Sequence, residues 1–158
     1  MQIRDLTDTD IEDVLKLNAH SVWALSPLDA DDLALARERS SLALVCELDG
    51  QVVAFAIVYG PGSSYESRNY AWHAARFDDF MYLDRIAVDP DFRRRGIANS
   101  IYDAAEEVAR EHGRLVCEVN SDPPNVESLA FHEARGFREI GQLTHPGGKR
   151  TAMLEKLL

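Results

Sequence analysis

Three consecutive arginines, Arg93 to Arg95, stand directly before Gly96 and a stretch with helical spacing. The start of a helix already carries partial positive charge from unpaired backbone N–H groups, so each cation placed there costs roughly 0.3–1 kcal/mol. Gly96 and the small Ala98 let the backbone approach a ligand closely, and the N–H groups of residues 95–99 can then converge on an anion. The pattern therefore predicts a phosphate-binding site.

A solvated basic turn is the alternative interpretation of so short a run of arginines. The segment contains neither GxGxxG nor GxxxxGK followed by Ser or Thr, which argues against a dinucleotide-binding fold and against a nucleotide-hydrolysing P-loop. The net charge of −10 disfavours a general attraction to nucleic acid or to an anionic membrane. It also makes a local run of arginines more informative, because the background is acidic.

Strands and helices that alternate along the chain must position this site. Apolar patterning predicts strands at 2–4, 42–48, 51–59, 80–88, 115–120, 137–143 and 151–157, and helices from residue 8, at 29–39, at 97–112 and at 125–135. Asp49-Gly50 between two apolar runs predicts a hairpin, and residues 60–79 are expected to form a long irregular connection. A chain of 158 residues is expected to form one domain, residues 1–158, of the α+β class with a mixed central sheet flanked by helices.

Two motifs in this order resemble the GNAT superfamily of acyl-CoA-dependent N-acyltransferases. Ile86-Ala87-Val88 followed by Arg93-x-x-Gly96-x-Ala98 is similar to the family's strand and its Q/R-x-x-G-x-G/A helix start. The block from Asn125 to Phe137 resembles the family's N-x₆-Y-x₃-G-F pattern. Residues 117–125 together with 147–150 are also similar to a bacterial group of predicted acetyltransferases with unassigned substrates.

The resemblance implies two parallel strands that splay apart and hold the pantetheine arm of coenzyme A, with acetyl-CoA as cosubstrate and no metal. Backbone groups of Ile86, Ala87 and Val88 would pair with the pantetheine amides. The residues expected at the pyrophosphate are Arg93, Arg94, Arg95, Gly96, Ile97, Ala98 and Asn99. Asn120 would lie near them, and Asn125 would contact the cofactor arm, cap the following helix, or do both.

The same resemblance requires a base, because an attacking amine must lose its proton. Asp84 is the favoured candidate, placed by two-residue alternation on the same strand face as Ile86 and Val88. Glu118, on the other splayed strand, is the second candidate. The alternative for Asp84 is a structural ion pair with the adjacent Arg85.

His132 stands where the family commonly has tyrosine, which serves as general acid for the departing CoA thiolate. Histidine can also donate a proton, and its unperturbed pKa of about 6.5 suits transfer near neutrality. His132 is therefore predicted to be catalytic and to contact the cofactor. The alternative is a partly buried, hydrogen-bonded histidine without a catalytic role.

The resemblance places the acceptor pocket near the first helices and the connection at 60–79. That connection supplies Tyr65, Arg68, Asn69, Tyr70, Trp72, His73 and Arg76. Such a mixture of side chains could recognise a small polar molecule with a carboxylate. The alternative is that the aromatic residues simply cover the edge of the sheet.

The leading prediction is an N-acetyltransferase that moves an acetyl group from acetyl-CoA to a primary amine of a small molecule or peptide, by direct attack in a ternary complex. A catalytically weak acyl-CoA-binding sensor is the alternative, and a nucleic-acid binder is opposed by the charge. A cysteine-based hydrolase is disfavoured, because Cys46 and Cys117 lie inside apolar runs. The first residues lack a signal-peptide pattern and no apolar run could span a bilayer, so we expect a cytoplasmic protein without membrane partners, possibly a homodimer.

Overall fold

A single sheet with the strand order β1-β2-β3-β4-β5-β7-β6 forms the centre of the computed structural model, which describes residues 1–158. The strands are β1 (Gln2–Asp5), β2 (Leu42–Leu48), β3 (Gln51–Tyr59), β4 (Met81–Val88), β5 (Arg114–Asp122), β6 (Arg138–Thr144) and β7 (Arg150–Leu157). Every neighbouring pair is antiparallel except β4 and β5, which run parallel. The mixed central sheet expected from the sequence is confirmed.

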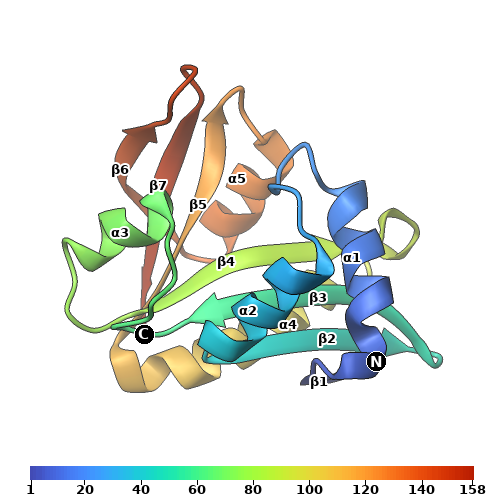
Figure 1. The fold of residues 1–158 in the computed structure, drawn as a ribbon. Helices are drawn as coiled ribbons and strands as arrows, with labels where there is room; N and C mark the ends of the chain where they lie inside the picture. The colour runs from blue at the N-terminus through green and yellow to red at the C-terminus, as the bar shows by residue number, and fades with distance from the viewer.

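Helices cover both faces of this sheet (Figure 1). They are α1 (Ile11–His20), α2 (Ala30–Arg39), α3 (Arg68–Ala74), α4 (Ile97–Ala109) and α5 (Val126–Ala134). Val14 of α1 and Leu33 of α2 are buried in one apolar cluster with Phe55 of β3. Tyr102 and Ala105 of α4 belong to a separate cluster on the opposite face. The two sets of helices therefore bury different faces of the same strands.

The connection at 60–79 is not irregular throughout, because α3 forms within it. Ser67 caps this helix by accepting a hydrogen bond from the Tyr70 backbone N–H at 3.3 Å. Tyr70 and His73 are buried beneath the helix, and Trp72 packs so closely on Gly141 that a Cβ there would lie 2.5 Å from its ring. With only seven residues, α3 is too short to give a clear helical pattern, so it was not predicted.

The parallel strands β4 and β5 separate soon after they meet. Only Met81–Leu115 and Tyr82–Val116 are in register, and beyond them the two strands diverge (Figure 1). The edge of β4 that faces β5 therefore has no strand partner from residue 83 onwards. Unpaired backbone donors and acceptors along this edge can bind an extended ligand.

A β-bulge interrupts β4 at the point of divergence. Ile57 of β3 pairs with Arg85 and Val58 pairs with Leu83, so Asp84 has no partner on β3. Such an extra residue reverses the alternation of side chains that follow it, and bulges are frequent beside active sites.

The bulge makes the predicted shared face of Asp84, Ile86 and Val88 wrong. Ile86 and Val88 pack with Ile97 on the α4 side of the sheet. Asp84 instead contacts Tyr65, on the side covered by α1 and α3. Simple two-residue alternation cannot detect one inserted residue, and here it assigned the wrong face.

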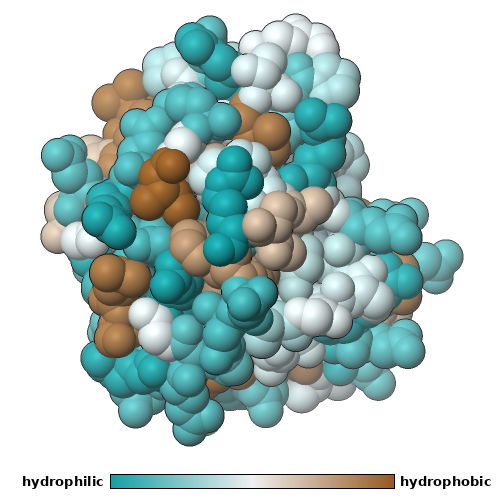
Figure 2. Space-filling model, turned by 90° about the vertical axis from the view of Figure 1, so that its left-hand side faces the viewer, coloured by the Kyte–Doolittle hydropathy of each residue, from teal (hydrophilic) through white to brown (hydrophobic).

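The surface that carries α3 is mainly hydrophilic, with hydrophobic residues in separate small patches (Figure 2). This distribution agrees with the acidic, highly charged sequence. None of the helices combines the length and apolar character needed to span a membrane.

Candidate active site

Three adjoining hollows form one cleft along the diverging strands. The wide end has a volume of about 300 Å³, the channel beside it about 230 Å³, and the hollow at the start of α4 about 160 Å³. Tyr102 and His132 line both the wide end and the channel. Val88 and Phe131 line both the channel and the hollow. The cleft therefore leads from the start of α4 to the interior side chains of β4 and β5.

The backbone N–H groups at the start of α4 have no hydrogen-bond acceptor within the protein. Gly96 is its N-cap with φ +78° and makes no side-chain cap, and Arg94 also has a positive φ of 60°. None of the backbone N–H groups from residue 94 to residue 99 donates a hydrogen bond within the protein. By contrast, Asp29, Ser67 and Asn125 cap α2, α3 and α5 with their side chains. The geometry fits a bound anion better than a solvated turn, since left-handed residues here turn successive amides toward one place.

The expected contacts of a coenzyme A molecule lie along this cleft. Ile86, Ala87 and Val88 all line the channel, on the unpaired edge of β4. Arg93, Arg94, Gly96, Ile97, Ala98 and Asn99 line the hollow, and the exposed Arg95 lies beside it in the same turn. These residues fit a ligand with an extended amide-bearing arm and a pyrophosphate.

The two asparagines predicted to contact the cofactor differ in their positions. Asn125 lines the channel, and its side chain also accepts the Ser128 backbone N–H at 3.2 Å, so it caps α5 and remains available to a ligand. Asn120 lines the wide end and does not line the hollow at the start of α4. Asn120 is therefore grouped with the wide end and not with the residues expected at the pyrophosphate, and its contact with the cofactor stays a prediction.

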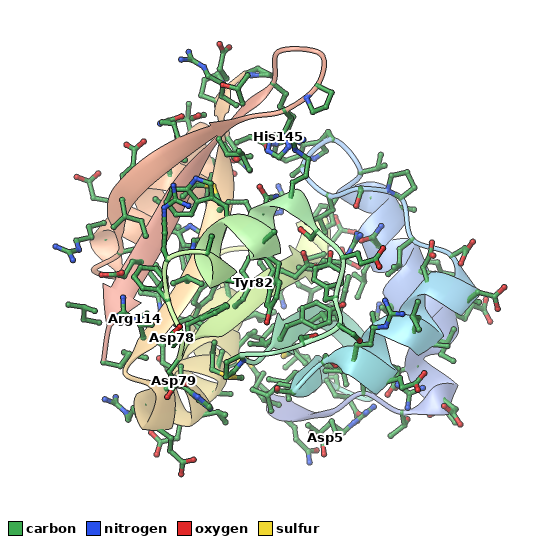
Figure 3. The ribbon with its side chains drawn as sticks, turned by 60° about the vertical axis from the view of Figure 1, so that its left-hand side comes forward. Asp5, Asp78, Asp79, Tyr82, Arg114 and His145 are labelled. Atoms are coloured by element: carbon green, nitrogen blue, oxygen red, sulfur yellow. The ribbon has the colours of Figure 1, made fainter.

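Two carboxylates that line the wide end, Asp84 of β4 and Glu118 of β5, lie on either side of the buried Tyr82 hydroxyl. The Tyr82 hydroxyl lies 2.9 Å from Glu118 Oε1 and 3.2 Å from Asp84 Oδ1, and its ring lies beneath α3 (Figure 3). Tyr65 donates to Asp84 at 2.9 Å, and Asn69 donates to Glu118 at 3.0 Å. The single phenol proton of Tyr82 can bond only one of the two carboxylates at a time.

Burial sets the electrostatics of this pair. It raises the pKa of Glu118 well above its ordinary value, and the charge of Asp84 raises that pKa further. Glu118 Oε2 is buried and has no hydrogen-bond partner in the protein. Burial also raises the pKa of Asp84, but Arg85, 3.4 Å away, opposes that shift. Asp84 is thus half of the ion pair considered from the sequence, and Glu118 is the carboxylate with a free basic oxygen.

His132 has both ring nitrogens engaged. Its Nδ1 lies 2.7 Å from the Ser128 carbonyl oxygen, which can only accept, so Nδ1 carries the proton. Its Nε2, 2.5 Å from the Tyr102 hydroxyl, must then accept. Burial lowers the pKa of His132, which favours this neutral form. The buried, hydrogen-bonded histidine considered from the sequence is what the structure contains, and its Nε2 has no proton to donate.

Polar and basic side chains border the wide end. His145, at the end of the β6–β7 hairpin (Figure 3), lies with its Nε2 3.1 Å from the Thr151 hydroxyl. Lys149 of the same hairpin is exposed and pairs with no acidic side chain. This rim can attract a polar molecule with a negative group.

The sequence interpretation missed two tyrosines of the cleft region: Tyr82, which bonds both carboxylates, and Tyr102, which bonds His132. Tyr82 could have been found, because it lies two residues before Asp84 on a predicted strand. Tyr102 lies one helical turn after Ala98, on the same face of α4 as this residue of the predicted phosphate site. Of the residues from the 60–79 connection, Tyr65, Ser67 and Asn69 line the wide end, and two of them, Tyr65 and Asn69, were named from the sequence.

The other aromatic residues of that connection cover the sheet, as the alternative held. Arg76 stacks on Trp72 at 3.4 Å, and Arg68 donates to the Thr144 carbonyl at 3.4 Å rather than lining the cleft. The structure contains no group of three or more metal-ligating side chains.

The family model described as "Acetyltransferase (GNAT) family" matches residues 9–137. The chain belongs to this family, whose enzymes use acetyl-CoA. The match contains both motifs and all residues of the cleft except those contributed by β7 and the hairpin before it.

One relative, the uncharacterized N-acetyltransferase MJ1207 of Methanocaldococcus jannaschii, is 33% identical over 96 residues, which is 60% of this chain and 38% of the relative. The chain thus spans well under half the length of that relative. Ard1 from Thermoplasma volcanium has a similar fold, with a TM-score of 0.77 at 22% identity over 99% of this chain and 97% of that one. The putative acetyltransferase yncA from Salmonella typhimurium, determined with acetyl-CoA, has a TM-score of 0.73 at 18% identity over 100% and 94%.

Proposed function

We propose that this protein is an N-acetyltransferase that moves an acetyl group from acetyl-CoA to a primary amine of a small molecule or peptide. The observation that carries the proposal is the continuity of the cleft. It joins uncapped amides at the start of α4 to a buried carboxylate, Glu118, whose Oε2 has no partner. One end suits the anion of an acyl donor, and the other suits removal of a proton from an amine.

Acetyl-CoA, the acyl donor, would lie between the diverging strands β4 and β5. Amides of residues 94–99 and the neighbouring arginines would hold the pyrophosphate, and the unpaired edge of β4 at residues 86–88 would pair with the arm. Acetyl-CoA supplies the acetyl group as a thioester. Its carbonyl would then face Glu118 and Asp84 across the wide end.

Glu118 is the base in this proposal, and Asp84 raises its pKa. Tyr82 and Asn69 fix Oε1 by hydrogen bonds, leaving Oε2 to accept a proton. As the neutral amine nitrogen forms a bond to the carbonyl carbon, one of its N–H protons passes to Oε2, and the bond from that carbon to sulfur breaks with its electron pair on sulfur. A raised pKa makes Glu118 a stronger base than an exposed glutamate, which suits proton transfer near neutral pH.

The basic rim favours an acceptor with a negative group. Lys149 borders the wide end, where its charge acts on Glu118, whereas burial lowers the pKa of His145 and favours its neutral form. An amine with a carboxylate or phosphate at its other end would complement both charges. This feature supports a small polar acceptor over an apolar one.

The test is release of free thiol from acetyl-CoA, together with mass-spectrometric detection of the amide, across a panel of primary amines. The panel should contain matched pairs with and without a carboxylate. We expect amine-dependent thiol release, faster for the carboxylate-bearing member of each pair. Binding of acetyl-CoA without any amine-dependent turnover would contradict the proposal and favour an acyl-CoA-binding sensor, the alternative function.

A further inference from the structure

We propose that Tyr102 of α4, held in place by His132 of α5, donates a hydrogen bond that stabilises the sulfur of coenzyme A as a thiolate when the acetyl group leaves. This inference rests on the proposed function. It assigns the group that stabilises the leaving sulfur to a residue on a different helix from the one that the sequence motif indicates.

Tyr102 lies where the sulfur of a bound acyl donor would be. Tyr102 and His132 are both among the residues where the channel passes into the wide end. A donor whose arm follows the channel and whose carbonyl faces Glu118 must place its sulfur at this passage. Tyr102 is therefore beside the atom that becomes negatively charged.

The hydrogen bonds of His132 show which group carries the proton between it and Tyr102. The Ser128 carbonyl fixes the His132 proton on Nδ1, 2.7 Å away. The contact of 2.5 Å between Tyr102 and His132 Nε2 is then made with the tyrosine proton. The phenol supplies the only proton at that contact, so His132 acts as a positioning residue.

The Tyr102 side chain is held rigidly by its neighbours. The Tyr102 ring is 1% exposed and packs edge-on against Phe137 and at a tilt against Phe131, with centroids 5.8 and 5.3 Å away. His132 also packs edge-on against its ring at 5.3 Å. Close packing on three sides fixes the direction of the hydroxyl group without preventing rotation of its hydrogen.

Departure of the CoA sulfur moves one electron pair and one amine proton. The carbon–sulfur bond breaks and its electron pair remains on sulfur, while the amine proton has gone to Glu118. The Tyr102 proton turns from His132 Nε2 to the sulfur, because hydrogen bonds to an ionised acceptor are roughly twice as strong as those to a neutral one. The sulfur leaves as a thiolate that accepts this hydrogen bond, and it takes up a proton from water when CoA is released.

Binding of free CoA, measured by calorimetry as a function of pH, tests this inference without turnover. The comparison ligand is a CoA analogue that lacks the sulfur atom. If Tyr102 donates to the ionised sulfur, CoA should bind more tightly as its thiol ionises, by about tenfold for each unit by which the bound thiol pKa is lowered. The analogue should show no such gain.

Three variants locate the donor. Tyr102→Phe should lose the sulfur-dependent gain, and in turnover it should lower kcat while leaving KM for acetyl-CoA unchanged. Tyr70→Phe is the matched control, since it removes another buried hydroxyl, bonded to the Gly60 carbonyl at 2.7 Å, from outside the cleft. His132→Phe should keep most of the gain, and His132→Gln replaces it if that variant does not fold.

A gain that survives in Tyr102→Phe, or that disappears only in the His132 variants, overturns the assignment of Tyr102. Wild-type protein that binds CoA and its analogue with the same pH dependence also overturns it, and leaves the donor site of the proposed function intact. Failure to bind either ligand would instead remove the proposed function, and this inference with it.

Discussion

The two ends of the cleft manage charge in opposite ways. At the start of α4 the positive groups are exposed: Arg93 to Arg95 are solvent-accessible, and the amides of residues 94–99 have no internal partner. At the wide end the negative groups are buried, and Glu118 has an oxygen without any partner. Anion binding benefits from accessible, unsatisfied donors. Proton transfer at neutral pH benefits from burial that raises a carboxyl pKa.

The two ends also differ in how the chain assembles them. The anion site is one continuous turn whose conformation depends on Gly96 and its neighbours. The proton-transfer site brings together Asn69, Tyr82, Asp84 and Glu118, from one helix and two strands. A local change should therefore remove binding at one end, whereas a single side chain should remove chemistry at the other end and spare binding.

Glu118→Gln should have the largest effect on turnover. Removal of a general base typically lowers the rate by about 10²–10⁴-fold, and glutamine can keep the hydrogen bond from Tyr82. We expect kcat to fall within this range while the affinity for acetyl-CoA, measured by calorimetry, stays the same. Glu107→Gln, an exposed glutamate on α4, is the control. A Glu118→Gln enzyme with wild-type kcat would assign the base elsewhere.

Arg95→Glu combined with Gly96→Asp should weaken CoA binding by roughly 10–100-fold, the equivalent of losing one hydrogen bond to a charged group. Two carboxylates at the helix start would repel the pyrophosphate. Arg110→Glu combined with Gly113→Asp is the matched control, because Gly113 also has a positive φ, of 73°, at the opposite end of the helix. Calorimetry measures both affinities, and circular dichroism checks folding. Equal affinities for the two double variants would place the anion elsewhere.

Asp84→Asn should shift the pH profile of kcat. The base must be ionised, so activity is lost as pH falls through the raised pKa of Glu118. The negative charge of Asp84 contributes to that raised pKa, after burial itself. Its removal should move the acidic limb to lower pH, while Asp122→Asn at the exposed end of β5 should leave it unchanged. A limb that vanishes in Asp84→Asn would make Asp84 the base, as first favoured from the sequence.

Glu118→Gln should also stabilise the fold modestly at high pH. A carboxyl whose folded pKa is raised contributes stability below its unfolded pKa of about 4.3, and that contribution is lost as pH rises through the folded value. The melting temperature of the variant should therefore exceed that of wild type by a few degrees at pH 9 and match it at pH 4. The same difference at both pH values would point to packing instead of charge.

Features determined by neighbouring residues could be predicted from the sequence. The hairpin at Asp49-Gly50 forms with φ of 52° and 77°, because both positions tolerate the left-handed region. The turn before α4 was predicted for the same reason, since glycine at position 96 permits its conformation. Asn125 was likewise recognised as a helix cap from its place after two prolines.

Features that depend on contacts distant in the sequence could not be predicted. The bulge that turns Asp84 away from Ile86 arises from the register between β3 and β4, which no local pattern records. The hydrogen bond between Tyr102 and His132 joins residues 30 positions apart on two different helices. The role of histidine at the motif position where the family commonly has tyrosine therefore could not be inferred from the motif alone. The position of Asn120 depends on how far β5 diverges from β4.

Thermal unfolding with and without acetyl-CoA tests the central claim most directly, namely that this cleft binds the acyl donor. A ligand at about 100 times its Kd stabilises the native state by roughly 2.7 kcal/mol, which raises Tm by roughly 5–10 °C in a chain of this size. We expect that rise for acetyl-CoA and for CoA with the wild-type protein, and at most about half of it for the Arg95→Glu and Gly96→Asp double variant at the same ligand concentration. An unchanged Tm at millimolar acetyl-CoA would contradict the claim and leave the exposed amides of α4 without their anion.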